Sequence, residues 1–358
     1  MKKTAILLFV AFITLLQTNS CKQCSTPKET TTDTTDSTDI PTLKSMNEAI
    51  KLDSLNPVLY YKRALLYEAN GDLKSAITDM YLALSIDTLR PELYLYTADL
   101  FKKSGEPIRG ISLMNKAIAT DSFQIPFYVK AAELAYIDTN IAKHYGLALD
   151  YLNTAIQKDP QNADVYFYKG NVYKEAGDTS KAISSFQTAT ELNPKFYDAF
   201  MQIGLLLKEK KDKNAAKYFD NAIRVKENGS DALYAKANVL KEEGVKLYDA
   251  NKLTEAVSKL QQAIAAFKQV IEQDHRNVEA YMGIGFSYYQ MDSVREAYEY
   301  YDKALKIAPT YAGAHFSKGL CAEDLGKTKE AIMLYQNCLN IDPEFSRAAK
   351  HLKDLQGN

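Results

Sequence analysis

The side chains most suited to chemistry are few and scattered. The chain carries four cysteines and four histidines, and two of each fall near the C-terminus: Cys321, Cys338, His315 and His351. Their spacing does not follow the paired pattern of a zinc site, so no metal is expected. Both cysteines stand where small side chains pack in the repeats described below. Burial as small hydrophobic residues is the expected role, and a disulfide between them is the alternative.

Signatures of other chemistries are missing from the sequence. It contains no phosphate-binding glycine-rich loop, no nucleophile elbow and no metalloprotease helix motif. The formal net charge is −1, with both signs interspersed, which does not favour a nucleic-acid partner. We therefore expect no cofactor and no nucleic acid, and a small-molecule ligand is not favoured.

The first twenty residues have the organisation of an export signal. Lys2 and Lys3 precede an apolar run that extends from Ala5 to Leu16. Such a run is too short to cross a bilayer core of ~30 Å as a helix. A basic start, a short apolar stretch and small polar residues before a cleavage point predict a signal peptide over residues 1–20.

Cys21 stands where the mature chain would begin. The arrangement resembles a bacterial lipoprotein signal, although Thr18 occupies the position where that signal usually has leucine. The resemblance implies acylation of Cys21 and, because Lys22 follows it, an outer-membrane protein that faces the periplasm or the cell surface. Cleavage after Ser20, which would leave a soluble periplasmic protein, is the alternative. Residues 21–41 are rich in Thr, Ser and Asp and read as a disordered tether.

Past the tether the chain repeats itself with a period near 34 residues. Each unit has a first helix marked by a small residue: Ala64, Ala98, Ala132, Gly170, Gly204, Gly244, Gly285 and Gly319. Each second helix has a large apolar residue between two small ones: Met80, Met114, Leu152, Phe186, Phe219, Leu260, Tyr301 and Tyr335. The spacings of three and four place these residues on one helix face, so the small residue lets the two helices approach while the large one fills the gap.

This pattern resembles the tetratricopeptide repeat (TPR). The resemblance implies an all-α fold, a right-handed α-solenoid of about eight helix-turn-helix units over residues 42–358. The expected units are 57–90, 91–124, 125–162, 163–196, 197–230, 231–277, 278–311 and 312–345. A half-repeat is expected before them, and a capping helix over 346–356 after them.

Two units depart from the period. The third has a longer turn between its helices, from Asp138 to Gly146. The sixth is stretched at the start of its first helix and at the end of its second, where Leu233 is placed to meet Phe267. The extra residues are either an insertion that packs on itself or an edge that docks a partner.

In tetratricopeptide repeats, the residues three before and one after the small position of the first helix line the concave surface. In this chain the positions expected to bind a peptide are Tyr61, Leu65, Leu95, Asp99, Phe167, Asn171, Met201, Met282, Phe286 and Phe316. The lysine and asparagine set that chaperone-binding members use to clamp a C-terminal carboxylate is not present. An apolar groove with a polar middle suits an extended or helical peptide held by aromatic side chains.

The leading interpretation is therefore a non-enzymatic scaffold. It would be a membrane-anchored lipoprotein that binds other proteins during assembly of the cell envelope. A carbohydrate- or nutrient-handling accessory lipoprotein is the alternative, since aromatic side chains also stack on sugars. An enzyme is not expected, because the repeats leave no residues for a catalytic domain.

Overall fold

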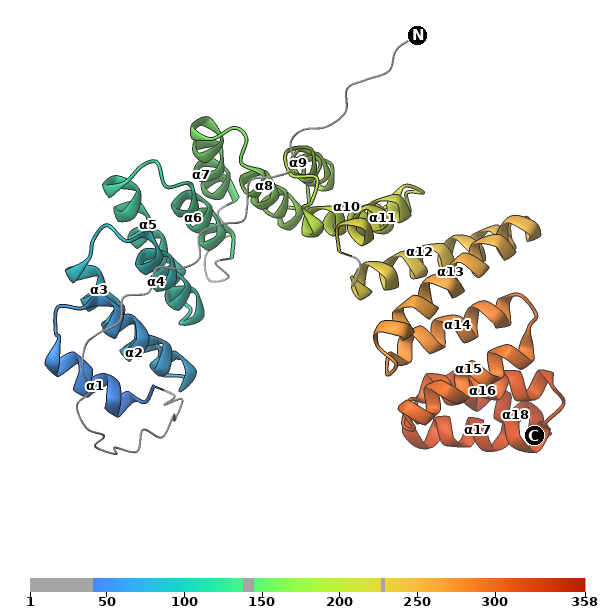
Figure 1. The fold of residues 1–358 in the computed structure, drawn as a ribbon. Helices are drawn as coiled ribbons and strands as arrows, with labels where there is room; N and C mark the ends of the chain where they lie inside the picture. The colour runs from blue at the N-terminus through green and yellow to red at the C-terminus, as the bar shows by residue number, and fades with distance from the viewer. Residues whose placement is uncertain (1–40, 138–144, 227–228, 358) are drawn as a thin grey trace, which may run out of the picture. The chain divides into compact units, whose positions relative to one another are not determined.

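The computed structural model describes residues 41–137, 145–226 and 229–357. All of the helices lie in the unit that begins at Leu43. The predicted signal peptide, Cys21, the tether up to residue 40 and the turn of the third unit up to residue 144 lie outside the described residues. Figure 1 labels the helices in chain order. They are α1 Leu43–Leu52, α2 Pro57–Ala69, α3 Leu73–Ile86, α4 Pro91–Lys103, α5 Pro107–Thr120, α6 Ile125–Ile137, α7 Tyr145–Lys158, α8 Ala163–Glu175, α9 Thr179–Leu192, α10 Tyr197–Glu209, α11 Ala215–Val225, α12 Ser230–Asp249, α13 Leu253–Gln273, α14 Val278–Gln290, α15 Val294–Ile307, α16 Ala312–Asp324, α17 Thr328–Ile341 and α18 Ser346–Gln356.

The helices pack in consecutive pairs, which confirms the predicted α-solenoid. Within each unit an even-numbered first helix packs against the odd-numbered second helix that follows it, and each second helix packs against the next first helix. The helix α1 packs on α2 as the half-repeat, and α18 packs on α17 at the other end. The described residues contain no strand. None of their helices has the length and apolarity needed to cross a membrane.

Short-range signals fix where the helices begin. Asp72 and Asp178 cap the starts of α3 and α9, because each carboxylate accepts a hydrogen bond from a backbone N–H of the first turn. Pro57 and Pro91 stand at the first position of α2 and α4, where the missing N–H of proline costs nothing.

In the seven units whose inner turn the structure describes, that turn holds a residue with left-handed backbone. Glycine supplies it at four turns, with φ between 72° and 80°: Gly71, Gly105, Gly177 and Gly326. Three turns use other residues in the same conformation: Lys211, Asn251 and Asp292. Asparagine and aspartate tolerate this region, whereas lysine adopts it at a cost of about 1 kcal/mol.

The small and large positions of each unit meet in the core, as their spacing predicts. A Cβ atom added at Gly170 would lie 2.5 Å from Cε1 of Phe186, and one at Gly204 would lie 2.6 Å from Cε1 of Phe219. The same close approach joins Gly285 to Tyr301. The facing large residues are buried, so each pair sets the distance between its two helices.

The sixth unit is longer than the others. Its helices α12 and α13 have 20 and 21 residues (Figure 1), against 13 and 14 in the unit that follows. Leu233 and Phe267 are both buried and belong to one hydrophobic cluster of α12, α13 and α14, which agrees with the predicted placement of the two residues. The extra seven residues of α12 lengthen the pair by about 10 Å.

Candidate functional site

Nine of the ten predicted groove residues lie on first helices and keep part of their surface in solvent. We call this set the first-helix strip: Tyr61, Leu65, Leu95, Asp99, Phe167, Asn171, Met201, Met282 and Phe286. Leu65 is the most accessible, with 38% of its surface exposed, and the others are half-buried. They flank the small residues that face the second helices, and several of them also pack with one side against the core of their units.

Tyr61 marks the first end of the strip. Its ring meets the ring of Tyr96 edge to face, with centroids 5.2 Å apart. Beside it is an open cavity of about 480 Å³ lined by Val58, Tyr61, Arg90, Glu92 and Leu93. The cavity joins α2 to α4 and offers an apolar wall with charged groups at its rim.

A second cavity lies around Phe167. It has a volume of about 370 Å³ and is lined by Ile125, Pro126, Val129, Asn162, Asp164, Phe167, Tyr168, Phe196 and Asp198. These residues come from α6, α8 and α10 and the turns before them, so the cavity crosses three consecutive first helices. Phe167 also packs against Phe196 and Phe186, with ring centroids 4.8 and 5.5 Å away. It is therefore both a wall of the cavity and part of the packing within its own unit.

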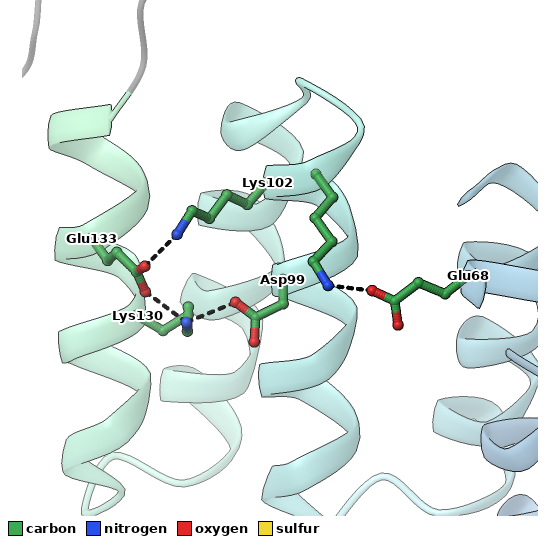
Figure 2. A network of polar contacts seen from close by, with 6 residues as sticks. Glu68, Asp99, Lys102, Lys130 and Glu133 are labelled. Carbon is green, nitrogen blue, oxygen red and sulfur yellow. Dashed lines mark hydrogen bonds and ion pairs between the residues drawn. The ribbon is translucent and has the colours of Figure 1, made fainter. Parts of the chain in front are cut away.

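The polar middle of the strip is an ion-pair network (Figure 2). Lys130 Nζ lies 2.8 Å from Asp99 Oδ1 and 2.6 Å from Glu133 Oε2, and Lys102 Nζ lies 2.7 Å from Glu133 Oε1. Lys103 pairs with Glu68 in the same way. The network joins α2, α4 and α6, so the carboxylates of the strip already have partners on neighbouring helices.

Burial sets the electrostatics of this network. Desolvation alone would raise the pKa of Glu133, but hydrogen bonds from Lys102 and Lys130 outweigh it and hold that pKa below its ordinary value. A hydrogen bond from Lys103, assisted by the Tyr96 hydroxyl, likewise lowers the pKa of Glu68. The predicted groove residues include Asp99, but the lysines that pair with Asp99 and Glu133 were not predicted.

Lys241 of α12 has a different environment. Its ammonium donates a hydrogen bond to Asn238 Oδ1 at 2.9 Å and lies 5.6 Å from the ring centroid of Phe286. Among the described residues it forms no ion pair with a carboxylate. Burial lowers its pKa, since the charged form loses hydration without gaining a counter-ion. This cation stands beside the apolar strip residue Phe286.

Phe316 does not belong to the strip, and its prediction as a groove residue is wrong. Only 3% of its surface is exposed. Its ring lies 5.0 Å from that of Phe345, and the guanidinium of Arg347 covers it at 4.7 Å. Helix α18 packs over this part of the last unit, so the position that elsewhere opens to solvent becomes core.

The cysteines and histidines of the last unit are packing residues. Cys321 and Cys338 are buried free thiols, and burial raises the pKa of Cys321 to about 12. His351 Nδ1 lies 3.0 Å from Glu323 Oε2, and His315 Nε2 lies 2.9 Å from the carbonyl of Pro309. Among the described residues no group of His, Cys, Asp and Glu is placed to hold a metal.

Similar sequences were found among curated proteins. The chain is 30% identical over 95 residues to the probable UDP-N-acetylglucosamine–peptide N-acetylglucosaminyltransferase SPINDLY of Solanum lycopersicum, covering 26% of this chain and 10% of that protein. It is 25% identical over 212 residues to Hsp70-Hsp90 organizing protein 3 of Arabidopsis thaliana, covering 57% of this chain and 35% of that protein. The chain thus spans about a tenth and a third of these relatives.

The fold and the family are supported by two further comparisons. The C-terminal part of a TPR repeat-containing protein from Cytophaga hutchinsonii superimposes with a TM-score of 0.58 at 20% identity, over 72% of this chain and 99% of that structure. Family models described as tetratricopeptide repeat match residues 58–88, 163–196, 278–311 and 312–345. The sequence pattern, the paired helices and these matches agree that the chain contains tetratricopeptide repeats.

Proposed function

We propose that this protein is a membrane-anchored scaffold that binds a peptide or helix of another protein along the first-helix strip. The observation that carries the proposal is the row of partly exposed apolar side chains on α2, α4, α8, α10 and α14. These side chains flank the small residues at which the two helices of a unit approach. The pairing of the helices therefore leaves part of their surface free for a ligand. Aromatic and methionine side chains on such a row suit a peptide held by a few apolar anchors.

The two cavities and the ion-pair network indicate what the ligand would carry. Apolar anchors would occupy the cavities beside Tyr61 and Phe167. The ion pairs of Lys130 with Asp99 and Glu133 join α4, which lines the first cavity, to α6, which lines the second. A ligand with polar groups at this position would form hydrogen bonds with charges that already have partners. Covering a paired charge costs less free energy than burying an unpaired one.

Anchoring is the second part of the proposal. It rests on Cys21 at the end of the predicted signal peptide and on the tether that follows it. Acyl chains on Cys21 and on the new amino terminus would hold the protein stably on a membrane. With outer-membrane placement, the scaffold would serve assembly in the cell envelope. One similar protein is Hsp70-Hsp90 organizing protein 3, and a role in bringing other proteins together fits that likeness.

Co-purification tests the binding part. Leu65 of the strip and Leu205, which lies on α10 one helical turn after the strip residue Met201, are each more than one-third exposed. Leu65→Ser with Leu205→Ser should therefore leave the melting temperature nearly unchanged. We expect proteins that co-purify with the wild-type chain from envelope extracts to be lost. The matched control is Leu82→Ser with Met333→Ser, two apolar residues on second helices that are somewhat more exposed. Equal retention of partners by both variants would refute binding at the strip.

Cell fractionation tests the anchoring part. Cys21→Ala should release the protein from the membrane fraction or block its maturation, because the thiol that would carry the lipid is gone. Metabolic labelling with a fatty-acid analogue should mark the wild-type chain alone. An unchanged amount of the variant in the membrane fraction would refute the lipoprotein assignment. It would not affect the binding proposal.

A further inference from the structure

The four most exposed large apolar side chains of the described residues all lie in the first part of the array. They are Leu52, Leu55, Leu89 and Phe123, with 91%, 76%, 79% and 82% of their surfaces exposed. The next most exposed is Ile108 at 55%. Leu55, Leu89 and Phe123 each stand three residues after the end of a second helix. We call the turns that carry them, with Leu52, the apolar edge.

The turns of the apolar edge are neighbours. A cavity of about 270 Å³ is lined by Leu89 from one turn and by Asp121 from the next. The cavity beside Tyr61 joins the start of α2 to Arg90, which lies in the turn of Leu89. Three consecutive turns therefore present apolar tips along one side of the first units.

Six of the described turns between units share one hydrogen bond, but their side chains differ. Asp87 accepts a hydrogen bond from the N–H of Leu89 at 3.1 Å, and Asp121 accepts one from the N–H of Phe123 at 3.0 Å. The same bond recurs where the corresponding residue is Gln161, Lys195, Arg276 or Glu344. An apolar tip is thus not needed to form the turn. Formation of the turn therefore does not explain why the exposed apolar tips occur only in the units next to the tether among the described residues.

We propose that the apolar edge docks onto the surface of the lipid bilayer to which the tether leads. Single apolar tips on rigid turns suit a fluid apolar phase, which closes around each tip without a complementary surface. Cations lie beside the tips. Arg90 pairs with Asp87 at 3.1 Å, and Lys158 Nζ stands 5.2 Å from the ring centroid of Phe123. Long basic side chains next to aromatic and aliphatic tips are typical of the bilayer interface.

The length of the chain before α1 is compatible with this contact. If residues 21–41 form the random coil that their composition predicts, they would span roughly 25 Å. The chain enters α1 at Leu43, and α1, with 10 residues, carries it about 15 Å to the apolar edge. A membrane attached at Cys21 is therefore within reach. The inference rests on the proposed anchoring and is independent of ligand binding at the first-helix strip.

Depth-dependent quenching tests the contact. The chain contains no tryptophan, so Phe123→Trp and Met333→Trp each introduce a single reporter, the second at an exposed site on α17. The full chain, as cells process it, is floated with phosphatidylethanolamine–phosphatidylglycerol vesicles that contain brominated phosphatidylcholine. We expect quenching and a blue shift several times stronger for Phe123→Trp than for Met333→Trp. Adding Leu55→Ser and Leu89→Ser should reduce the quenching, whereas Ile108→Ser and Leu253→Ser should not.

Each outcome is decisive. A chain that floats with vesicles while the reporter of Phe123→Trp stays unquenched overturns the docking and leaves the anchoring intact. A chain that does not float overturns both. In a third outcome, the fluorescence of the Phe123→Trp reporter stays unchanged with vesicles and shifts to the blue when a fraction of envelope proteins is added. That result would show that the apolar edge is a protein interface, and it would refute the inference.

Discussion

Replacing Gly170 by alanine should push apart the two helices of the fourth unit. The added methyl would lie 2.5 Å from Phe186, a fully buried ring. Overpacking of this kind costs about 1–3 kcal/mol. Alanine in place of a helical glycine gains about 0.5–1 kcal/mol. The free energy of unfolding of this unit should therefore fall by about 1–2 kcal/mol.

The chain itself supplies the compensating change. Where the small residue of the first helix is alanine, the large residue of the second helix is aliphatic, as with Ala98 and Met114. Phe186→Met alone should cost about 1.5 kcal/mol. Combined with Gly170→Ala it reproduces the pairing of the second unit, so the double variant should be more stable than the sum of the two single changes by about 1–2 kcal/mol.

Hydrogen exchange on α8 and α9 measures the effect locally, because repeat arrays do not unfold in a single all-or-none step. Gly146→Ala is the control, since its added methyl has open space and should be neutral or slightly stabilising. Unchanged protection in Gly170→Ala would refute the argument from close approach. Strict additivity in the double variant would show that the two positions do not act as a pair.

Three further outcomes follow from other positions. Lys211→Gly should stabilise the turn after α10 by about 1 kcal/mol, measured by hydrogen exchange, because lysine there adopts φ 55°; no gain would contradict the strain. The ion pairs of Glu133 with Lys102 and Lys130 depress its folded-state pKa. Their stabilisation is present above the ordinary pKa of 4.5 and is lost as pH falls through the lower folded value. Hydrogen exchange in α4 and α6 should accelerate in that pH range. A Glu133→Gln variant that keeps the same pH response would refute the role of Glu133. Lys241→Met should raise the melting temperature, because a desolvated cation without a carboxylate partner is removed; a lower melting temperature would count against this.

Repeat register was enough to predict the core. The positions of Gly170 and Phe186 follow from a spacing that recurs in every unit, and packing inside a unit depends on that spacing alone. The same holds for Leu233 and Phe267, since a lengthened helix pair must fill its own extension with apolar residues.

Exposure was harder to predict than position. Phe316 has the register of Phe167, but α18 covers it, and a repeat pattern does not tell which units have a neighbour. The lysine partners in the network were also not predicted. Lys130 and Glu133 are three residues apart on one helix, a spacing that favours ion pairs. The apolar tips lie in turns, where neither helical periodicity nor the family pattern gives an expectation.

Photo-crosslinking in intact cells tests the central claim most directly. A benzophenone amino acid is placed at Tyr61, Phe167 and Phe286 of the first-helix strip, and at Phe316 as the control with the same register under α18. The account predicts covalent adducts with other proteins at the three strip positions and none at Phe316. No adducts from the strip, or equal adducts from Phe316 in a chain that melts normally, would contradict the claim that this face binds proteins.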